Sequence, residues 1–276
     1  MSETLTLLSP AKLNLFLHIT GRRPDGYHEL QTLFQLLDWG DRLTFTPNRS
    51  GAITLEFDGP DIPLADNLIY RAAQLLRHGT LGAHITVAKQ VPAGGGLGGG
   101  SSNAATTLLA LNHLWRLGRQ QNELQDLGAS LGADVPVFVG GRTAWAEGIG
   151  ERLTPVDLPE HWYVIITPPC HVPTAQIFSH LELTRNSSPI KMAAVFEGYS
   201  RNDCQDLVRR LYPEVDEALN WLERFAEARL TGTGASIFAS FESEAEAQAV
   251  FQQLPHGWTG VSARGLNESP VIAYID

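Results

Sequence analysis

The feature that most constrains how this chain can fold is a glycine run, in which six of the seven residues from 94 to 100 are glycine. Inside a helix or strand each glycine costs conformational entropy and adds no side chain to pack. The run follows a strand-like segment, 84–91, and precedes apolar residues at helical spacing. It therefore predicts a loop whose backbone N–H groups approach an anion at a helix N-terminus, where the helix dipole favours negative charge.

Two common kinds of phosphate loop do not account for this run. A Walker loop needs Lys and then Ser or Thr after its last glycine, whereas Gly100 is followed by Ser101. Residues 94–99 fit the G-x-G-x-x-G dinucleotide spacing, but a glycine run produces such a match almost automatically. The acidic residue expected about 20 positions later would be Glu123 or Asp126, and both lie in a helical pattern rather than at a strand end.

The rest of the chain alternates between strand and helix patterns. Residues 11–19 carry an apolar side chain at every odd position, which predicts a half-buried strand. Further strands are predicted at 44–47, 53–58, 84–91, 143–147, 163–167, 237–241, 260–263 and 271–274, with a short extended piece at 135–139. Helices are predicted after the capping residues Asp66, Ser101 and Asn122, and at 205–211, 214–228 and 244–254.

The order of these elements indicates the fold class. Strands and helices alternate without strict βαβ units, so an α+β fold is favoured. Prolines interrupt the pattern between 154 and 161, where we expect a boundary between domains 1–157 and 158–276. A chain of 276 residues, 43% of them hydrophobic, is long enough for two medium domains.

The composition excludes several classes of partner. The net charge of -10 and the lack of any Lys/Arg run longer than two residues argue against nucleic acid, whose binders carry a basic face. No apolar stretch approaches membrane-spanning length, and the first residues show no signal peptide. Cys170 and Cys204 form no C-x-x-C pair, so we expect reduced thiols and a cytoplasmic protein.

Three motifs together resemble the GHMP kinase family. Residues 92–102, P-A-G-G-G-L-G-G-G-S-S, resemble the family's phosphate loop, 9–15, S-P-A-K-L-N-L, its N-terminal motif, and 230–236, L-T-G-T-G-A-S, its C-terminal glycine motif. They occur in the family's order and span nearly the whole chain. The resemblance implies an ATP-dependent small-molecule kinase with an N-terminal domain like ribosomal protein S5 domain 2 and a ferredoxin-like C-terminal domain, with the active site between them.

Two further segments narrow the resemblance to one branch of the family. Residues 19–30, I-T-G-R-R-P-D-G-Y-H-E-L, and 131–138, L-G-A-D-V-P-V-F, are similar to the branch of the non-mevalonate isoprenoid pathway. That branch phosphorylates a hydroxyl of a cytidine-diphosphate-linked polyol. The resemblance therefore implies two small-molecule substrates, ATP and such a polyol.

Lys12 and Asp134 are the candidate catalytic residues. Lys12 and Asn14 share one strand face, from which a lysine can reach a transferring phosphoryl group or the acceptor oxygen. A solvated strand lysine and an ordinary turn aspartate are the alternatives for either residue taken alone. The resemblance favours catalysis, with Asp134 accepting the hydroxyl proton and Lys12 lowering the pKa of that hydroxyl. Because Val135-Pro136 follows, we expect Asp134 in a fixed, non-helical bend.

The resemblance also supplies candidates for binding the two substrates. Tyr27 and His28 follow a turn and suit stacking and hydrogen bonding of a flat base, with Phe178 as the partner from the C-terminal domain. The alternatives are a Tyr27 that packs against the strand, a surface His28 and a Phe178 at a core helix position. The other acceptor-site candidates are Asn14, Thr233, Gly234 and Ala235. The candidates for ATP are Asn67, Leu68, Lys89, Asn103 and the loop residues Pro92, Ala93, Gly94, Gly95, Gly96, Leu97, Gly98, Gly99, Gly100, Ser101 and Ser102.

One departure from the family concerns magnesium. Mg²⁺ is expected, because ATP phosphates must be neutralised during transfer. Several relatives hold it with a glutamate in the helix after the glycine loop, but residues 101–117 contain no Asp or Glu. The metal ligands are therefore left unassigned, with Ser101, Ser102 or Asp134 expected near an ion held mostly by ATP and water.

The alternatives that stay open are another GHMP kinase, such as a homoserine or mevalonate kinase, and non-catalytic roles. A catalytically inactive nucleotide sensor is disfavoured by Lys12 and Asp134, and an RNA-binding module by the acidic charge. A monomer or weak homodimer is expected. The Ser- and Asn-rich stretch 184–191 has the composition of a mobile segment, and the sequence assigns it no role.

Overall fold

The computed structural model describes residues 4–59, 62–198 and 201–275. The start of the chain, where no signal peptide is indicated, lies partly outside these residues. The strands are β1 Leu5–Arg22, β2 His28–Asn48, β3 Ile53–Asp58, β4 Gly82–Ala88, β5 Ala144–Gly148, β6 Arg152–Pro155, β7 Trp162–Thr167, β8 Arg229–Leu230, β9 Ile237–Phe241 and β10 Thr259–Leu266. The helices are α1 Leu68–Leu75, α2 Gly99–Leu114, α3 Gln121–Ala129, α4 Val135–Gly140, α5 Thr174–Ser179, α6 Met192–Phe196, α7 Gln205–Leu211, α8 Pro213–Leu222, α9 Glu244–Phe251 and α10 Pro270–Ile275.

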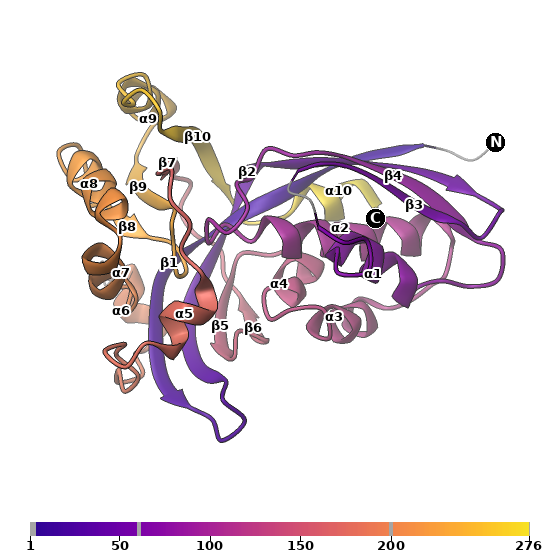
Figure 1. Cartoon of the computed structure of the whole chain (residues 1–276), viewed down its shortest axis with the longest axis horizontal. Coiled ribbons are helices and arrows are strands. Elements are labelled where there is room, and N and C mark those ends of the chain that lie inside the picture. The colour runs from indigo at the N-terminus through magenta and orange to yellow at the C-terminus, as the bar shows by residue number, and fades with distance from the viewer. Residues whose placement is uncertain (1–3, 60–61, 199–200, 276) are drawn as a thin grey trace.

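The hairpin of β1 and β2 runs through both halves of the molecule (Figure 1). β2 pairs with β4 at one end, with β10 in its middle and with β5 near the hairpin turn, so the ten described strands are connected into one sheet. The prediction of a half-buried strand at 11–19 is wrong, because the even positions, Lys12, Asn14, Phe16 and His18, are buried as well. Polar side chains on that face are held in a site rather than in solvent.

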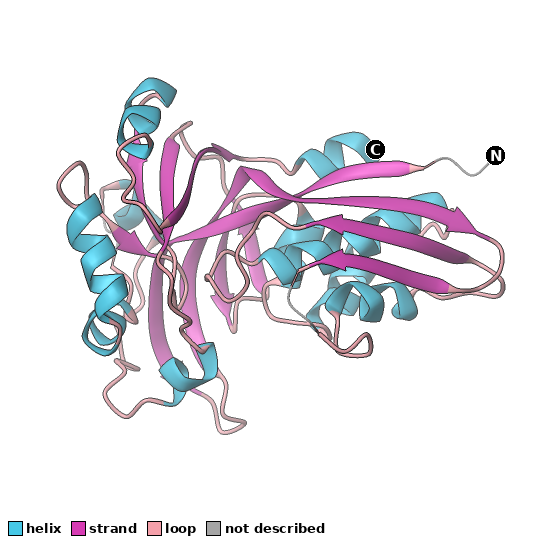
Figure 2. Ribbon diagram, turned by 45° about the horizontal axis from the view of Figure 1, so that its top comes forward, coloured by secondary structure: helices cyan, strands magenta, loops and turns pink. Residues whose placement is uncertain are grey.

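The N-terminal half places helices against the strands β1 to β5. α1 to α4 lie on one side of these strands (Figure 2), and their apolar residues close a core with β2 and β4. The C-terminal half packs α7 to α9 against β7, β9 and β8, with a second core. The α+β class is confirmed. None of the helices in the described part of the chain combines the length and the apolar character needed to span a membrane.

The predicted helix starts are each displaced. Asn67, not Asp66, caps α1, and its Oδ1 accepts from the N–H of Ile69 at 3.0 Å. Gly98, not Ser101, occupies the N-cap of α2. Gln120, not Asn122, caps α3, where it forms a capping box with Glu123. Apolar periodicity locates the buried face of a helix but does not fix its N-cap to a single residue.

Two segments predicted as extended are helices. The stretch 135–139 forms α4, which is buried at every position from Val135 to Val139, and β-branched residues at helix positions are tolerated when packing decides. Asp134 therefore stands at a helix N-cap with αR backbone, not in a non-helical bend. The predicted strand 271–274 is α10, which begins with Pro270 and buries Val271 in the N-terminal core. The predicted helix 214–228 ends at Leu222.

Candidate active site

Two cavities meet at the glycine loop. The larger, about 720 Å³, lies between the two halves of the chain, and the smaller, about 300 Å³, lies between α1, β4 and the loop. Gly96 and Ser101 line both cavities. A ligand in either cavity therefore reaches the same few backbone atoms, which is the arrangement a group transfer between two ligands requires.

The loop is shaped by glycines at positions where any other residue would be strained. Gly96 has φ +74°, and a Cβ there would lie 2.3 Å from the carbonyl oxygen of Thr231. Gly98 has φ +72°, and a Cβ there would lie 2.8 Å from Cζ of Phe138. The L-amino acids avoid this region of φ, and the close neighbours leave no room for a side chain. The glycine run therefore allows both the positive-φ backbone of the loop and the close approach of neighbouring segments to it.

The loop is docked on both sides by backbone hydrogen bonds. The N–H of Lys12 donates to the Leu97 carbonyl at 3.0 Å, and the N–H of Ser236 donates to the Gly95 carbonyl at 3.1 Å. Since α2 begins at Gly99, the N–H groups of Gly99, Gly100 and Ser101 have no acceptor within the helix, and these three residues line the smaller cavity. This combination is suited to phosphate oxygens.

Lys12 and Asp134 lie together where the cavities meet. Lys12 Nζ is 3.3 Å from Asp134 Oδ2, and it donates to Asn14 Oδ1 at 2.5 Å and to the Gly96 carbonyl at 3.0 Å. The Lys12 side chain is 3% exposed, whereas Asp134 is 35% exposed and lines the larger cavity. The buried cation is therefore fixed by three oxygens, while the carboxylate stays accessible to a ligand.

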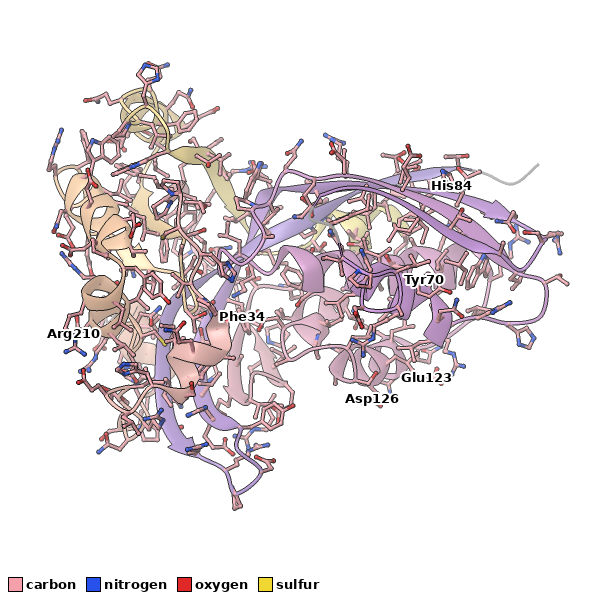
Figure 3. All side chains as sticks on the ribbon, in the orientation of Figure 1. Phe34, Tyr70, His84, Glu123, Asp126 and Arg210 are labelled. Atoms are coloured by element: carbon pink, nitrogen blue, oxygen red, sulfur yellow. The ribbon has the colours of Figure 1, made fainter. Side chains whose placement is uncertain are left out.

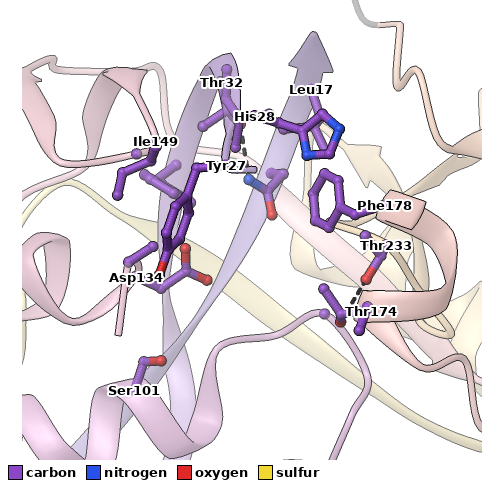
Figure 4. Close-up of a pocket in the computed structure, with 18 of the residues that line it drawn as sticks. Leu17, Tyr27, His28, Thr32, Ser101, Asp134, Ile149, Thr174, Phe178 and Thr233 are labelled. Carbon is purple, nitrogen blue, oxygen red and sulfur yellow. Dashed lines mark hydrogen bonds between the residues drawn. The ribbon is translucent and has the colours of Figure 1, made fainter. Parts of the chain in front are cut away.

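A network of hydroxyl and amide groups holds this pair. Asn14 Nδ2 donates to Thr32 Oγ1 at 2.8 Å, and its backbone N–H donates to Thr231 Oγ1 at 2.9 Å. Thr233 lines the larger cavity, and its hydroxyl is 2.9 Å from that of Thr174 (Figure 4). The turn 231–234 thus reaches the strand that carries Lys12 and contributes its own side chain to the cavity wall.

The far end of the larger cavity is aromatic. Phe178 on α5 stacks with the ring of His28, with centroids 5.1 Å apart and planes 27° apart. Figure 4 shows this pair on one side of the cavity and Tyr27 on the other. Tyr27 is 59% exposed. Burial lowers the pKa of His28, and the nearby cations Arg185 and Arg22 lower it further, so His28 is neutral near pH 7.

Not every candidate reaches a cavity. Ser102 is buried, with its hydroxyl 2.8 Å from that of Ser9, and Ala235 is buried behind the turn; neither these two nor Gly234 lines either cavity. The other loop candidates, 92–101, line the smaller cavity, as do Asn67, Leu68, Lys89 and Asn103. The larger cavity brings together Lys12, Asn14, Tyr27, His28, Asp134, Phe178 and Thr233.

Sequence reasoning missed Asp41, which organises the smaller cavity from behind. Its side chain is fully buried, and Oδ1 accepts from the N–H groups of Gln90 and Val91 at 2.7 and 2.8 Å. Its Oδ2 accepts from Lys89 Nζ at 2.7 Å and from Asn103 Nδ2 at 2.8 Å. The sequence signal that could have identified Asp41 is the period of two along the strand. Residues 41 and 43 lie on the same strand face, and Leu43 on that face is buried.

The dinucleotide alternative for the loop finds no support in the structure. Glu123 and Asp126 lie on α3, both exposed, and Figure 3 shows them at the outer side of that helix. Neither stands at the end of a strand beside the loop, where a ribose-binding acid would be required.

The protein groups available to a magnesium ion are few. α2 contains no acidic residue, and the described residues hold no group of three or more His, Cys, Asp or Glu placed to bind a metal. The Ser101 hydroxyl and the Asp134 carboxylate are two oxygen groups that line the larger cavity beside the loop. This set fits an ion coordinated mainly by ligand phosphates and water, as is usual for Mg²⁺, and does not fit a cage built by the protein.

The chain matches two family models, the GHMP kinases N terminal domain over residues 67–142 and the GHMP kinases C terminal over residues 183–259. It is similar to 4-diphosphocytidyl-2-C-methyl-D-erythritol kinases of Hahella chejuensis, at 56% identity covering 98% of this chain and 96% of the relative, and of Marinobacter nauticus, at 55% identity covering 98% and 97%. The protein of that name from Pseudomonas putida strain W619 is 58% identical, covering 96% and 94%.

Solved structures agree with this similarity. A crystal structure of 4-(cytidine 5'-diphospho)-2C-methyl-D-erythritol kinase superposes with a TM-score of 0.82 at 34% identity, covering 95% of this chain and 99% of that one. A mevalonate kinase from Methanococcus jannaschii superposes with a TM-score of 0.66 at 14% identity, covering 97% and 99%, which shows the shared fold alone.

Proposed function

The chain belongs to the GHMP kinases, and among them to the 4-diphosphocytidyl-2-C-methyl-D-erythritol kinases, and on that premise we propose that its smaller cavity holds ATP and its larger one the cytidine-diphosphate-linked acceptor. It is an ATP-dependent kinase of the MEP isoprenoid pathway. The observation that carries the proposed placement is the sharing of Gly96 and Ser101 by both cavities, with Lys12 and Asp134 beside them.

In the proposed reaction, Asp134 accepts the proton of the acceptor's 2-hydroxyl as its oxygen attacks the γ-phosphorus of ATP. The P–O bond to ADP breaks as the new bond forms, and Lys12 stabilises the charge on the attacking and transferring oxygens. The loop amides hold the remaining phosphates. Phosphoryl transfer asks a protein mainly for such positioning and electrostatic stabilisation.

Mg²⁺ would neutralise the phosphate charge of ATP when bound, and Ser101 and Asp134, which line the larger cavity, would be its candidate protein ligands. Lys12 acts independently of the metal, because its ammonium group is already fixed by Asn14 and the Gly96 carbonyl.

The test of the function is acceptor choice in a coupled assay of ADP release with ATP and Mg²⁺. We expect turnover with 4-diphosphocytidyl-2-C-methyl-D-erythritol and a product whose new monophosphate is located on the 2-oxygen by phosphorus NMR. Homoserine and mevalonate should give only background release of ADP, because a small aliphatic acceptor has no ring that could stack at the aromatic end of the larger cavity. Turnover of either at a comparable kcat/KM would overturn the proposal.

Replacement of Tyr27 by alanine should raise KM for the cytidine substrate while leaving KM for ATP within twofold. Stacking of a base on an aromatic ring is worth about 1–3 kcal/mol, so we expect an increase of roughly 5- to 150-fold. The matched control is Tyr274→Ala, because Tyr274 on α10 is 61% exposed, as Tyr27 is 59% exposed. Equal changes in both KM values would assign Tyr27 a folding role instead.

Three further statements remain proposals. We place the domain boundary at 157/158, with α10 returning to pack against the N-terminal core. We propose a monomer or weak homodimer in the cytosol, where the free thiols Cys170 and Cys204 stay reduced. A nucleic-acid partner is not proposed, because the chain carries a net charge of -10.

A further inference from the structure

Arg185 lies in the 184–191 stretch and connects both members of the stacked pair at the aromatic end of the larger cavity. Its Nε donates to Nε2 of His28 at 3.1 Å. Its Nη2 donates to the carbonyl oxygens of Phe178 and His180 at 2.8 and 2.6 Å, and its Nη1 donates to the Leu183 carbonyl at 3.1 Å. One guanidinium group therefore ties the strand that carries His28 to the end of the helix that carries Phe178.

The segment around Arg185 is itself anchored to the hairpin. The N–H of Ser187 donates to the Ile19 carbonyl at 3.1 Å, and the N–H of Ile190 donates to Gln31 Oε1 at 2.9 Å. These bonds reach β1 before the hairpin turn and β2 after it, so they flank the turn that carries Tyr27 and leads into His28. A segment with the composition of a loop thus presents its arginine in a fixed position.

The bond from Arg185 decides which form of His28 is present. A guanidinium nitrogen is always a donor, so Nε2 of His28 must be the acceptor and its proton must be on Nδ1. An imidazolium could not accept this bond. Among the residues the structure describes, His28 Nδ1 has no hydrogen-bond partner, although His28 lines the cavity. Its N–H is therefore available to an acceptor atom of a ligand.

We propose that Arg185 is a positioning residue for the base of the acceptor substrate: it holds His28 as the neutral Nδ1–H tautomer, ready to donate to a ring nitrogen or carbonyl of the base, and it fixes Phe178 beside it. This inference rests on the proposed function of the larger cavity. It assigns a role to the 184–191 stretch, to which composition assigned none.

The charged groups that act on His28 agree with this role. Burial lowers the pKa of His28, and the cations Arg185, from the segment after α5, and Arg22, from β1, lower it further. Because that pKa lies below its ordinary value near 6.5, wild-type His28 stays neutral through the neutral range, and the bond from Arg185 then selects its tautomer. Removal of Arg185 frees Nε2, raises the pKa and allows either tautomer.

The first measurement needs no variant. Nitrogen-15 NMR of the ring-labelled wild-type protein at pH 7.5 should show His28 as the Nδ1–H tautomer, with its resonances identified by their loss in His28→Gln. An Nε2–H tautomer or an imidazolium at that pH would overturn the proposal. This readout does not depend on the substrate or on turnover.

The second measurement is the KM for the cytidine substrate in Arg185→Gln. We expect it to rise about 10-fold at pH 8, with kcat and KM for ATP within twofold of wild type, because the lost hydrogen bond lies at the base end. The ratio of variant to wild-type KM should fall toward 1 as the pH decreases below about 6, since protonated His28 again carries a hydrogen on Nδ1. Arg185→Lys, which keeps a donor and the charge, should give an intermediate increase.

The control is Arg210→Gln. Arg210 pairs with Glu182 on the surface of the C-terminal half (Figure 3), 60% exposed, and it should change neither KM nor the His28 tautomer. A KM ratio for Arg185→Gln that is independent of pH, or equal increases in both KM values, would indicate a merely structural arginine and contradict the inference. If wild-type protein failed to phosphorylate the cytidine substrate, the proposed function would fail while the tautomer result still stood.

Discussion

Asp134→Asn should lower kcat by about 10²- to 10⁴-fold with little change in either KM, because a positioned general base contributes that much to a proton transfer and asparagine accepts no proton. The loss falls on kcat, since the base acts in the transition state rather than in substrate binding. The fold should survive. Asp134 is 35% exposed, and Lys12 keeps its bonds to Asn14 and the Gly96 carbonyl when the charge is removed.

Steady-state kinetics with saturating ATP and cytidine substrate, together with circular dichroism of the purified variant, measure this effect. Asp126→Asn provides the matched control. Asp126 is an exposed aspartate on α3, the helix that precedes α4, and it lines neither cavity (Figure 3). A folded Asp134→Asn variant that turned over within threefold of wild type would exclude the general-base role.

Asp41→Asn should lower the free energy of unfolding by about 3–5 kcal/mol and raise KM for ATP. The substitution removes the fully buried carboxylate that faces the Lys89 ammonium group. It leaves that cation, which is only 14% exposed, without its partner, and removing one member of such a pair is costly. The amide nitrogen of the new side chain would also face the amide nitrogen of Asn103, so a donor meets a donor. Lys89 and Asn103 both line the smaller cavity, which connects the stability defect to ATP binding.

Denaturant unfolding of the protein without ligands gives the stability change, and ATP titration gives the binding change. The matched control is Asp157→Asn, which breaks an aspartate–arginine pair of 2.6 Å in which Asp157 is 74% exposed. Such surface pairs contribute below about 1 kcal/mol. If both variants lost the same small amount of stability, Asp41 would not be the organising group of the cavity.

The site could be predicted from sequence to the extent that its parts are local. The glycine run predicts a loop from backbone preference alone, because glycine adopts positive φ, as at Gly96 and Gly98, without steric cost. Tyr27 and His28 beside a turn, and Lys12 with Asn14 on one strand face, are likewise set by neighbours in the chain. Their assignment to a kinase came from resemblance rather than from these patterns.

The errors occurred where packing overrode local preference. Val135 to Val139 include β-branched residues and a proline and suggest an extended segment. They form a helix with Asp134 as its N-cap because all five positions are buried. The segment predicted as a strand at 271–274 is the helix α10, which begins at Pro270 and buries Val271 in the N-terminal core. The alternation at 11–19 indicated a strand correctly but could not report that its second face is covered too.

The sequence by itself determined the anion-binding loop, the α+β class and most of the residues that line the two cavities, because these follow from backbone preference and from motifs read along the chain. Only the tertiary structure decided that the cavities share Gly96 and Ser101, that Asp41 stands behind Lys89, and that Arg185 holds His28. Arg185 and His28 are 157 positions apart. Contacts of that range depend on how the whole chain packs, and no local pattern of residues encodes them.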